Sequence, residues 1–294
     1  MAHSIAAGHT RARTADYLTL AKPRLNVLVV MSAMAGYVMG GGPMSDAALV
    51  VMTVAGTALV AGGASAFNQV IERVTDAQMA RTRLRPMADR RLQPSEGLLV
   101  ASVFTIAGLS LLALGVNLLA AGVAAATLLT YAAIYTPLKS RTSLSTVIGA
   151  VPGALPPVIG WAAATGTLSR GGWVLFGIVF LWQLPHFLAI AWMYREEYAR
   201  AGLPMLPVIE PDGRSTARQA VVYAAALLPM SLAPTLIGMA TPTYFVGALI
   251  LSVLFLGLAV RFAMTRHRTD ARRLFFGSIT YLPLLWVLMI AGRT

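Results

Sequence analysis

Long apolar segments alternate with short polar ones along almost the whole chain. Nine of these segments are about 16 to 21 residues long, which is close to the length that an α-helix needs to cross the hydrocarbon core of a bilayer. Strict alternation of apolar and polar residues, typical of lipid-facing strands, is absent. The expected spans are 25–40, 47–67, 98–114, 118–135, 144–164, 173–193, 220–239, 244–262 and 274–291. The pattern predicts an all-α membrane protein, a bundle of nine transmembrane helices.

Composition agrees with this prediction. Hydrophobic residues make up 57% of the 294 residues and charged residues only 12%, roughly half the charged share of a soluble domain. Cysteine is absent, which excludes disulfides, thiolate metal sites and cysteine nucleophiles. The first fifteen residues are polar and lack the apolar core of a signal peptide. We therefore expect a polar tail at 1–16 and a single polytopic domain at 17–294.

Basic residues are sorted between the two ends of the predicted spans. Of the 23 Lys and Arg residues, 21 lie in the N-terminal segment or in connections two, four, six and eight, and only Arg170 and Arg293 fall on the other side. By the positive-inside rule this places the N-terminus in the cytoplasm and the C-terminus outside. The net charge of +12 is explained by this sorting and by anionic headgroups, so it does not indicate a nucleic-acid partner.

The second connection begins with the stretch "AFNQVIERVTDAQMARTRLRP". Asn68, Glu72 and Asp76 are four residues apart, so on a helix they share one face. Two carboxylates and an amide are hard oxygen ligands suited to Mg²⁺, and the guanidinium groups of Arg81 and Arg85 could hold phosphate oxygens. The pattern favours a magnesium–diphosphate site over its alternative, which is ordinary solvated charge at the end of a span.

Four stretches together resemble a known family: "NQVIERVTDAQMARTRLRP", "YTPLKSRTSLSTVIGAVPGALPPVIGW", "LWQLPHFLAIAWMYREEYARAGLPMLPV" and, more loosely, "LTLAKPRL". They resemble the intramembrane UbiA-type polyprenyltransferases, and within these the branch of protohaem IX farnesyltransferases. The resemblance implies that the chain transfers a farnesyl group from farnesyl diphosphate to a vinyl group of haem b, giving haem O, with Mg²⁺ as cofactor. It further implies the lipid bilayer and a downstream haem-modifying or oxidase-assembly protein as partners. The bacterial cytoplasmic membrane is the expected location, ahead of the mitochondrial inner membrane.

The resemblance also assigns residues. It implies that Asn68, Glu72 and Asp76 are the metal ligands and that Lys139 acts with them in catalysis. It makes Arg81, Arg85, Lys139 and Arg141 the diphosphate-binding residues. A second acidic motif would consist of Tyr194, Glu196 and Glu197.

The chain departs from the family pattern at three positions. Val74 stands where another acid is common, Ser145 stands where Asn is expected, and Tyr194 stands where quinone-type relatives carry Asp. The last departure leaves open whether one or two metal ions bind.

His186 follows Pro185 within the sixth predicted span, among apolar residues. A titratable side chain at membrane depth is a functional candidate, because burying it without a purpose is costly. An imidazole can ligate haem iron or act as a base, so His186 is a haem-binding candidate, although a hydrogen-bonded structural role is the alternative.

Span five carries helix breakers. Three prolines are expected to bend or unwind it, and three glycines to allow close helix approach, leaving a central cavity in the bundle. These residues are Pro152, Pro156, Pro157, Gly149, Gly153 and Gly160.

Two other functions remain as alternatives. A UbiA-type enzyme for a quinone or chlorin precursor would share the fold and differ in the acceptor, and "QLPHF" followed by "YREEY" argues against it. A secondary transporter would also use broken helices, but it would place ionisable residues near the midplane of several spans, and the acids here lie almost entirely in the predicted cytoplasmic connections.

The predicted topology can be tested with compartment reporters. Fusions at Thr294 and within the connection at 261–273 should report opposite sides of the membrane, because span nine separates them. Two reports from the same side would contradict the nine-span topology.

Overall fold

The computed structural model describes residues 13–294. Within them, nine helices are long and apolar enough to cross a membrane, so the predicted number of spans is confirmed. Of the expected polar tail, residues 1–12 lie outside the described part, and residues 13–16 begin a helix that continues to residue 20. The helices are α2 (Pro23–Met39), α3 (Ala47–Ala77), α4 (Pro94–Gly115), α5 (Leu118–Leu129), η1 (Thr130–Tyr135), α6 (Thr136–Leu138), α7 (Ser145–Ala154), α8 (Pro156–Thr165), α9 (Arg170–Met193), α10 (Arg195–Arg200), α11 (Leu206–Ile209), α12 (Arg214–Leu236), α13 (Pro242–Thr265) and α14 (Arg268–Ala291).

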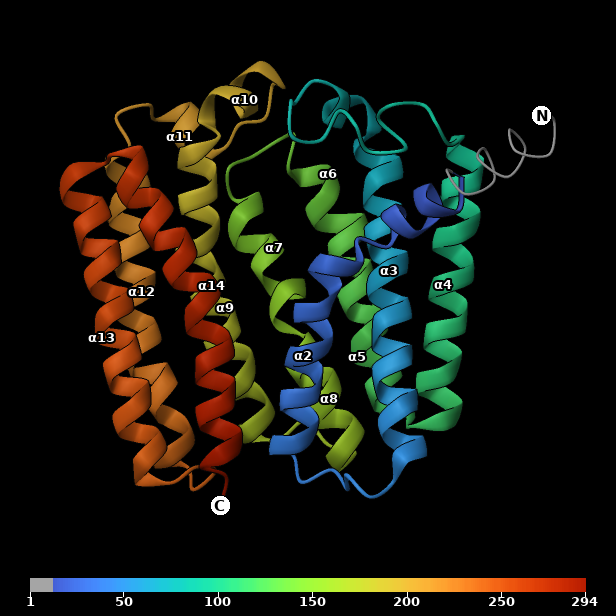
Figure 1. The fold of residues 1–294 in the computed structure, drawn as a ribbon, viewed down its shortest axis with the longest axis vertical. Coiled ribbons are helices and arrows are strands. Elements are labelled where there is room, and N and C mark those ends of the chain that lie inside the picture. The colour runs from blue at the N-terminus through green and yellow to red at the C-terminus, as the bar shows by residue number, and fades with distance from the viewer. Residues whose placement is uncertain (1–12) are drawn as a thin grey trace, which may run out of the picture.

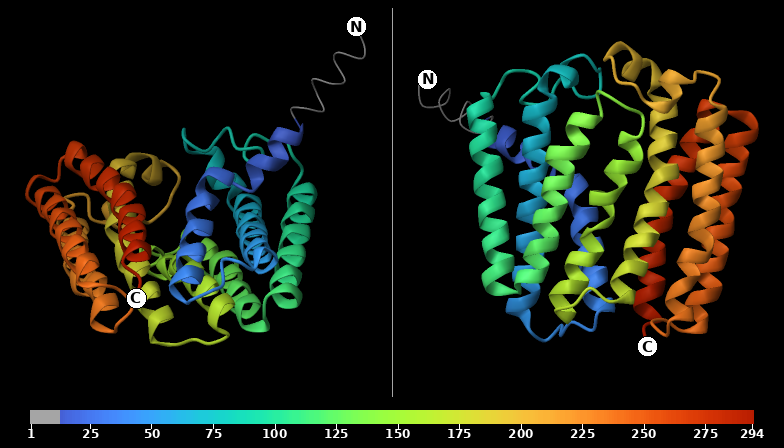
Figure 2. Two further views of the ribbon diagram at one scale, coloured as in Figure 1. Left: turned by 60° about the horizontal axis from the view of Figure 1, so that its bottom comes forward. Right: turned by 180° about the vertical axis from the view of Figure 1, so that it is seen from behind.

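The long helices run side by side in one bundle (Figure 1). In the N-terminal half α3 packs along α4, and in the C-terminal half α9 packs against α12 and α14, while α2 packs along α8 of the central region. The two halves flank the region of α7 and α8 (Figure 2). The spans formed by α7–α8 and by α9 are the most buried, at 61% and 56% of their apolar windows, so they form the centre of the bundle.

The polar connections gather at one end of the bundle. The connection between α3 and α4 and the short helices α10 and α11 lie at the same end, and the C-terminus lies at the opposite one (Figure 1). This placement agrees with the sorting of basic residues, which requires successive connections to lie at alternate ends of the bundle. Which end faces the cytoplasm stays a prediction.

Helix α3 continues ten residues beyond the expected end of its span. Asp46 caps its start by accepting a hydrogen bond from the Leu49 amide at 3.0 Å. No proline or glycine interrupts the chain from residue 64 to residue 77, so nothing stops the helix when the apolar segment ends. The extension brings Asn68, Glu72 and Asp76 onto a continuous helix.

Span five bends at Leu155, as the prolines predicted. Pro156 occupies the first position of α8, where its missing N–H costs little, and Pro152 lies inside α7. The Gln183 side chain of α9 donates to the Ala150 carbonyl at 2.7 Å, which satisfies a backbone acceptor close to the bend. The bend is therefore supported by a side chain from a neighbouring span.

Helices α2 and α8 touch through glycines. A Cβ atom on Gly160 would lie 1.7 Å from the Ala33 carbonyl oxygen, and one on Gly36 would lie 1.9 Å from that of Pro157. Any larger residue at these positions would push the two backbones apart. The contact holds α2, and with it the start of the first span, close to the broken span at the centre.

Candidate active site

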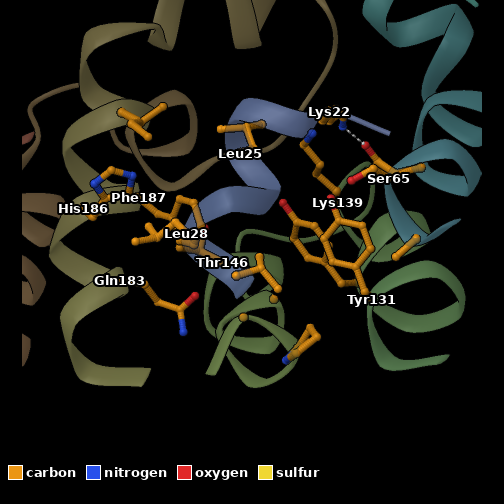
Figure 3. Close-up of a pocket in the computed structure, with 18 of the residues that line it drawn as sticks. Lys22, Leu25, Leu28, Ser65, Tyr131, Lys139, Thr146, Gln183, His186 and Phe187 are labelled. Carbon is orange, nitrogen blue, oxygen red and sulfur yellow. Dashed lines mark hydrogen bonds between the residues drawn. The ribbon is translucent and has the colours of Figure 1, made fainter. Parts of the chain in front are cut away.

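A cavity of about 440 Å³ opens among α2, α3, α7 and α9. Its polar end contains the side chains of the α3 stripe and several cations. Its remaining wall is mostly apolar and includes Leu25, Leu28, Val29, Ala61 and Val179. Figure 3 shows Lys22, Tyr131 and Lys139 on one side of the pocket and Gln183, His186 and Phe187 on the other. The cavity thus joins a charged site to an apolar space of ligand size.

The predicted acidic stripe faces this cavity. Asn68, Glu72 and Asp76 are 3%, 8% and 1% exposed, so they are not the solvated surface charge of the alternative interpretation. Carboxylates at such depth require cationic or hydrogen-bonding partners. Each residue of the stripe has one.

Two of the pairs are ion pairs. The Lys139 ammonium lies 3.0 and 3.1 Å from the two carboxylate oxygens of Glu72. Arg85 donates from Nη1 to Asp76 Oδ2 at 2.7 Å. Burial is the largest single influence on the pKa of Lys139 and lowers it, but the Glu72 carboxylate and the nearby tyrosines together outweigh burial, so the pKa is raised. Because a raised pKa keeps the proton to higher pH, Lys139 stays an ammonium through neutral and mildly alkaline conditions.

The third partner, Lys22, escaped the sequence analysis. Its ammonium donates to Asn68 Oδ1 at 2.8 Å from the turn that precedes α2. Lys22 has φ 46° and ψ 55°, a left-handed conformation that is unfavourable for a residue with a Cβ, and Pro23 follows it. With this backbone conformation the side chain of Lys22 points into the bundle, where it reaches Asn68. The signals in the sequence were a basic residue directly before the apolar run and its place in the stretch "LTLAKPRL".

The residues present fit a hard divalent cation. Asn68, Glu72 and Asp76 offer oxygen donors on one helix face, and Asp76 Oδ1 is enclosed without a hydrogen-bond partner. A buried carboxylate oxygen without a partner is costly, and a bound cation would satisfy it. Within residues 13–294, no cluster of three or more His, Cys, Asp or Glu residues forms a complete cage, so part of the coordination would come from elsewhere, as is usual for Mg²⁺.

Charge at this end of the cavity is positive overall. Three lining side chains are cationic and two are carboxylates, an excess of one positive charge, and the amine of Lys22 lies at the same end. The cations are Arg81, Arg85 and Lys139. A polyanion such as a diphosphate is attracted by this excess, and the low polarity of the surroundings strengthens the attraction.

Arg81 is held by two tyrosines. Its guanidinium lies 5.0 Å from the ring centre of Tyr194 and 4.9 Å from that of Tyr198, and Nη2 donates to the Tyr198 hydroxyl at 2.6 Å. Cation–π contacts on both rings fix the side chain at the mouth of the cavity. Tyr194, which was predicted as part of the second acidic motif, therefore contacts the Arg81 guanidinium. The sequence analysis did not identify Tyr198.

The other residues of the predicted set lie in different places. Glu197 keeps an enclosed oxygen, Oε2, without a partner, whereas the side chain of Glu196 is 83% exposed and pairs only loosely with Arg195, at 4.0 Å. Arg141 is exposed and is not among the residues that line the cavity. The structure thus gathers most of the predicted set around the cavity, namely Asn68, Glu72, Asp76, Arg81, Arg85, Lys139 and His186. Tyr194, Glu196, Glu197 and Arg141 are not among the residues that line it.

A π-helical turn, η1, shapes the wall next to Lys139. The Thr136 amide and hydroxyl both donate to the Tyr131 carbonyl, the hydroxyl at 2.8 Å, and Pro137 has no amide hydrogen to continue the α-helical pattern. Tyr131 and Tyr135 line the cavity from this turn, with ring centres 5.4 Å apart. The spacing of four from Tyr131 to Tyr135 to Lys139 was a signal that the sequence analysis did not use.

His186 lies in the wall contributed by α9. Its ring stacks against Trp182 at 5.4 Å and against Phe275 of α14 at 5.0 Å, and Nδ1 lies 2.7 Å from the Ser278 hydroxyl. The imidazole is therefore fixed by aromatic and polar contacts across two spans.

Comparison of the sequence with known proteins gives the same family by a family profile and by individual relatives. The sequence profile of the UbiA prenyltransferase family matches residues 29–282. A protoheme IX farnesyltransferase of Solibacter usitatus is 50% identical over 287 residues, covering 95% of this chain and 98% of the relative.

Solved structures share the fold. A digeranylgeranylglyceryl phosphate synthase superposes with a TM-score of 0.80 at 15% identity, covering 96% of this chain and 98% of its own. A UbiA homologue of Archaeoglobus fulgidus bound to GPP and Mg²⁺ gives 0.65 at 15% identity, covering 93% and 99%.

The ion pair between Lys139 and Glu72 can be tested by removing its charges one at a time. Lys139→Met leaves a carboxylate in the cavity wall without its partner and should lower the free energy of unfolding by about 3 kcal/mol. Adding Glu72→Gln to this variant should recover most of the loss, because no unpaired charge remains. Thermal stability in detergent would show this, and a double variant as unstable as Lys139→Met would contradict the pairing.

Proposed function

The chain belongs to the UbiA prenyltransferase family, and on that premise we propose that it transfers a farnesyl group from farnesyl diphosphate to a vinyl group of haem b, giving haem O. The observation that carries the proposal is the junction of a cationic, carboxylate-lined pocket with an apolar space. The chain is a multi-pass membrane protein, and we place it in the bacterial cytoplasmic membrane.

The cationic end suits the diphosphate. Arg81, Arg85, Lys22 and Lys139 present donors that match phosphate oxygens, and their excess of positive charge favours the leaving group as its negative charge develops. Arg141 has no place in this step, because it is exposed and away from the cavity.

Metal dependence is supported by the UbiA homologue of Archaeoglobus fulgidus, which has been solved with GPP and Mg²⁺ bound. In this chain Asn68, Glu72 and Asp76 would hold Mg²⁺, and Asp76 Oδ1 is an oxygen of this set that has no hydrogen-bond partner to give up. When bound, Mg²⁺ neutralises diphosphate charge and so lowers the barrier to its departure. Lys22, Lys139 and Arg85, which pair with these same ligands, can then turn to the diphosphate oxygens.

The reaction itself needs no protein nucleophile. The bond between farnesyl C1 and the diphosphate oxygen breaks, and the electron pair leaves with the oxygen. The haem vinyl group then supplies its π electrons to C1 and forms the new carbon–carbon bond. Water adds to the resulting cation and releases a proton, so the products are haem O, diphosphate and H⁺.

The cavity protects the allylic cation. Its apolar wall limits the access of water until the vinyl group has reacted, and the rings of Tyr131 and Tyr135 present π faces that attract positive charge. The farnesyl tail occupies the apolar part, and the product passes to a protein that modifies haem further or assembles an oxidase.

The acceptor separates this function from its alternatives. Purified protein with haem b, farnesyl diphosphate and Mg²⁺ should form a more hydrophobic haem and release diphosphate, and chelation of the metal should stop both. With 4-hydroxybenzoate in place of haem no product is expected. Prenylation of the benzoate alone would overturn the haem assignment, and no diphosphate release with either acceptor would overturn the transferase.

The acidic stripe gives a second test. Asp76→Asn and Glu72→Gln should each lower kcat at least 100-fold while leaving folded protein, since loss of a metal ligand removes several kcal/mol of charge stabilisation in the transition state. Asp212→Asn is the matched control, because Asp212 is an exposed carboxylate that pairs only with Arg214. Wild-type rates in both stripe variants at saturating Mg²⁺ would rule out the metal assignment.

A further inference from the structure

One polar contact, on the side of the cavity formed by α9 and α14, has no role in the diphosphate chemistry. His186 lines the cavity from α9, and its Nδ1 lies 2.7 Å from the hydroxyl of Ser278 on α14. Ser278 is completely buried. A hydroxyl and an imidazole placed together inside an apolar bundle must satisfy each other, because water is not available to do so.

The hydrogen bonds of Ser278 determine which ring nitrogen carries the proton. The hydroxyl has one hydrogen, and it donates this hydrogen to the Phe275 carbonyl at 2.6 Å. The same oxygen can then only accept from His186, so the hydrogen of the neutral imidazole is on Nδ1. Nε2 is left with its lone pair.

The ring is also held in position. Trp182 stacks on it at 5.4 Å with an angle of 22° between the planes, and Phe275 at 5.0 Å with 28°. Trp182 donates from Nε1 to the Ser278 carbonyl at 2.8 Å, so two residues of α9 are anchored on the same residue of α14. Rotation of the imidazole about its side-chain bonds would break these contacts.

Nε2 has no hydrogen-bond partner within residues 13–294, although the ring borders the cavity. A histidine that served only to join α9 and α14 would gain from satisfying both nitrogens. A fixed, unprotonated nitrogen at a cavity wall is instead the arrangement of a metal-ligating imidazole, whose other nitrogen donates to a neighbouring acceptor.

We infer that His186 is an axial ligand to the iron of the haem substrate through Nε2, and that Ser278 is the positioning residue that fixes its tautomer and orientation. The inference rests on the proposed function and extends it to the way in which the acceptor is bound. Ligation at the centre of the porphyrin leaves its rim, which carries the vinyl groups, free to face the pocket side formed by Lys139 and Tyr131 (Figure 3).

The experiment compares haem binding in wild type, Ser278→Ala and Ser231→Ala. Ser231 is the matched control, because it is equally buried and its hydroxyl also makes a 2.7 Å bond, to Tyr281 rather than to His186. Loss of the Ser278 hydroxyl should weaken haem b binding about 10-fold, as expected when the partner of a metal-ligating imidazole is removed. Ser231→Ala should bind haem b as wild type does.

Two further measurements separate iron ligation from packing. Metal-free protoporphyrin IX has no iron to ligate, so wild type and Ser278→Ala should bind it equally. In ferrous wild type the iron–imidazole stretching band should be present in resonance Raman spectra. It should shift in Ser278→Ala and disappear in His186→Ala, with added imidazole restoring it in His186→Gly.

Absence of the iron–imidazole band from ferrous wild type would overturn the inference without any variant having to fold. Equal losses of haem b and protoporphyrin IX binding in Ser278→Ala would overturn it as well, because the hydroxyl would then act only through packing. If wild type still farnesylates haem in either case, the proposed function stands and only the mode of haem binding is wrong.

Discussion

The structure depends on how three polar side chains are kept buried on the face of α3. Asn68, Glu72 and Asp76 would each be costly at this depth without partners. Each is instead paired with a basic residue from a different part of the chain, the residues being Lys22, Lys139 and Arg85. These pairs draw together the start of α2, the end of α6 and the connection after α3. The same pairs therefore hold the polar end of the cavity together and set the charge distribution of the site.

Interruptions in the helices provide the space that this arrangement needs. The bend at Leu155 and the π-helical turn at 130–135 both occur beside prolines, and both border the cavity. Unsatisfied backbone groups are tolerated in a membrane protein only where protein or a cavity receives them. Here the side chains of Gln183 and Thr136 add hydrogen bonds to the carbonyls of Ala150 and Tyr131, beside these interruptions. An unbroken pair of spans would close the apolar space that a prenyl chain requires.

Much of the fold could be predicted from hydrophobic periodicity, because each span must be apolar over the thickness of a bilayer. The stripe on α3 and the bend in span five were also predictable, since four-residue spacing and proline act locally. Helix ends were less predictable: Arg266 and His267 alone separate α13 from α14, and these spans extend beyond their apolar segments.

Residues that depend on tertiary contacts could not be predicted. Lys22 enters the site through a left-handed backbone conformation, and Ser278 meets His186 from 92 positions away in sequence. The family resemblance placed Arg141 with Lys139 at the diphosphate, but a two-residue step turns a side chain away from its neighbour on a helix or a tight turn, and Arg141 is exposed. The spacing of residues along the sequence shows which of them share a face of one helix. It does not show which helix faces pack against each other in the fold.

The division of the cavity between the two halves of the bundle has a chemical consequence. Every prenyl transfer from a diphosphate must neutralise the same leaving group, and the groups for that task come from the start of α2, from α3 and its following connection, and from the end of α6. The acceptor varies between enzymes of such a family, so its recognition has to be built elsewhere. In this chain the opposite wall, formed by α9 and α14, carries an imidazole with a fixed tautomer and surrounding aromatic rings. Because the two walls use different helices, one can change its ligand chemistry while the other keeps the charge arrangement that ionisation requires.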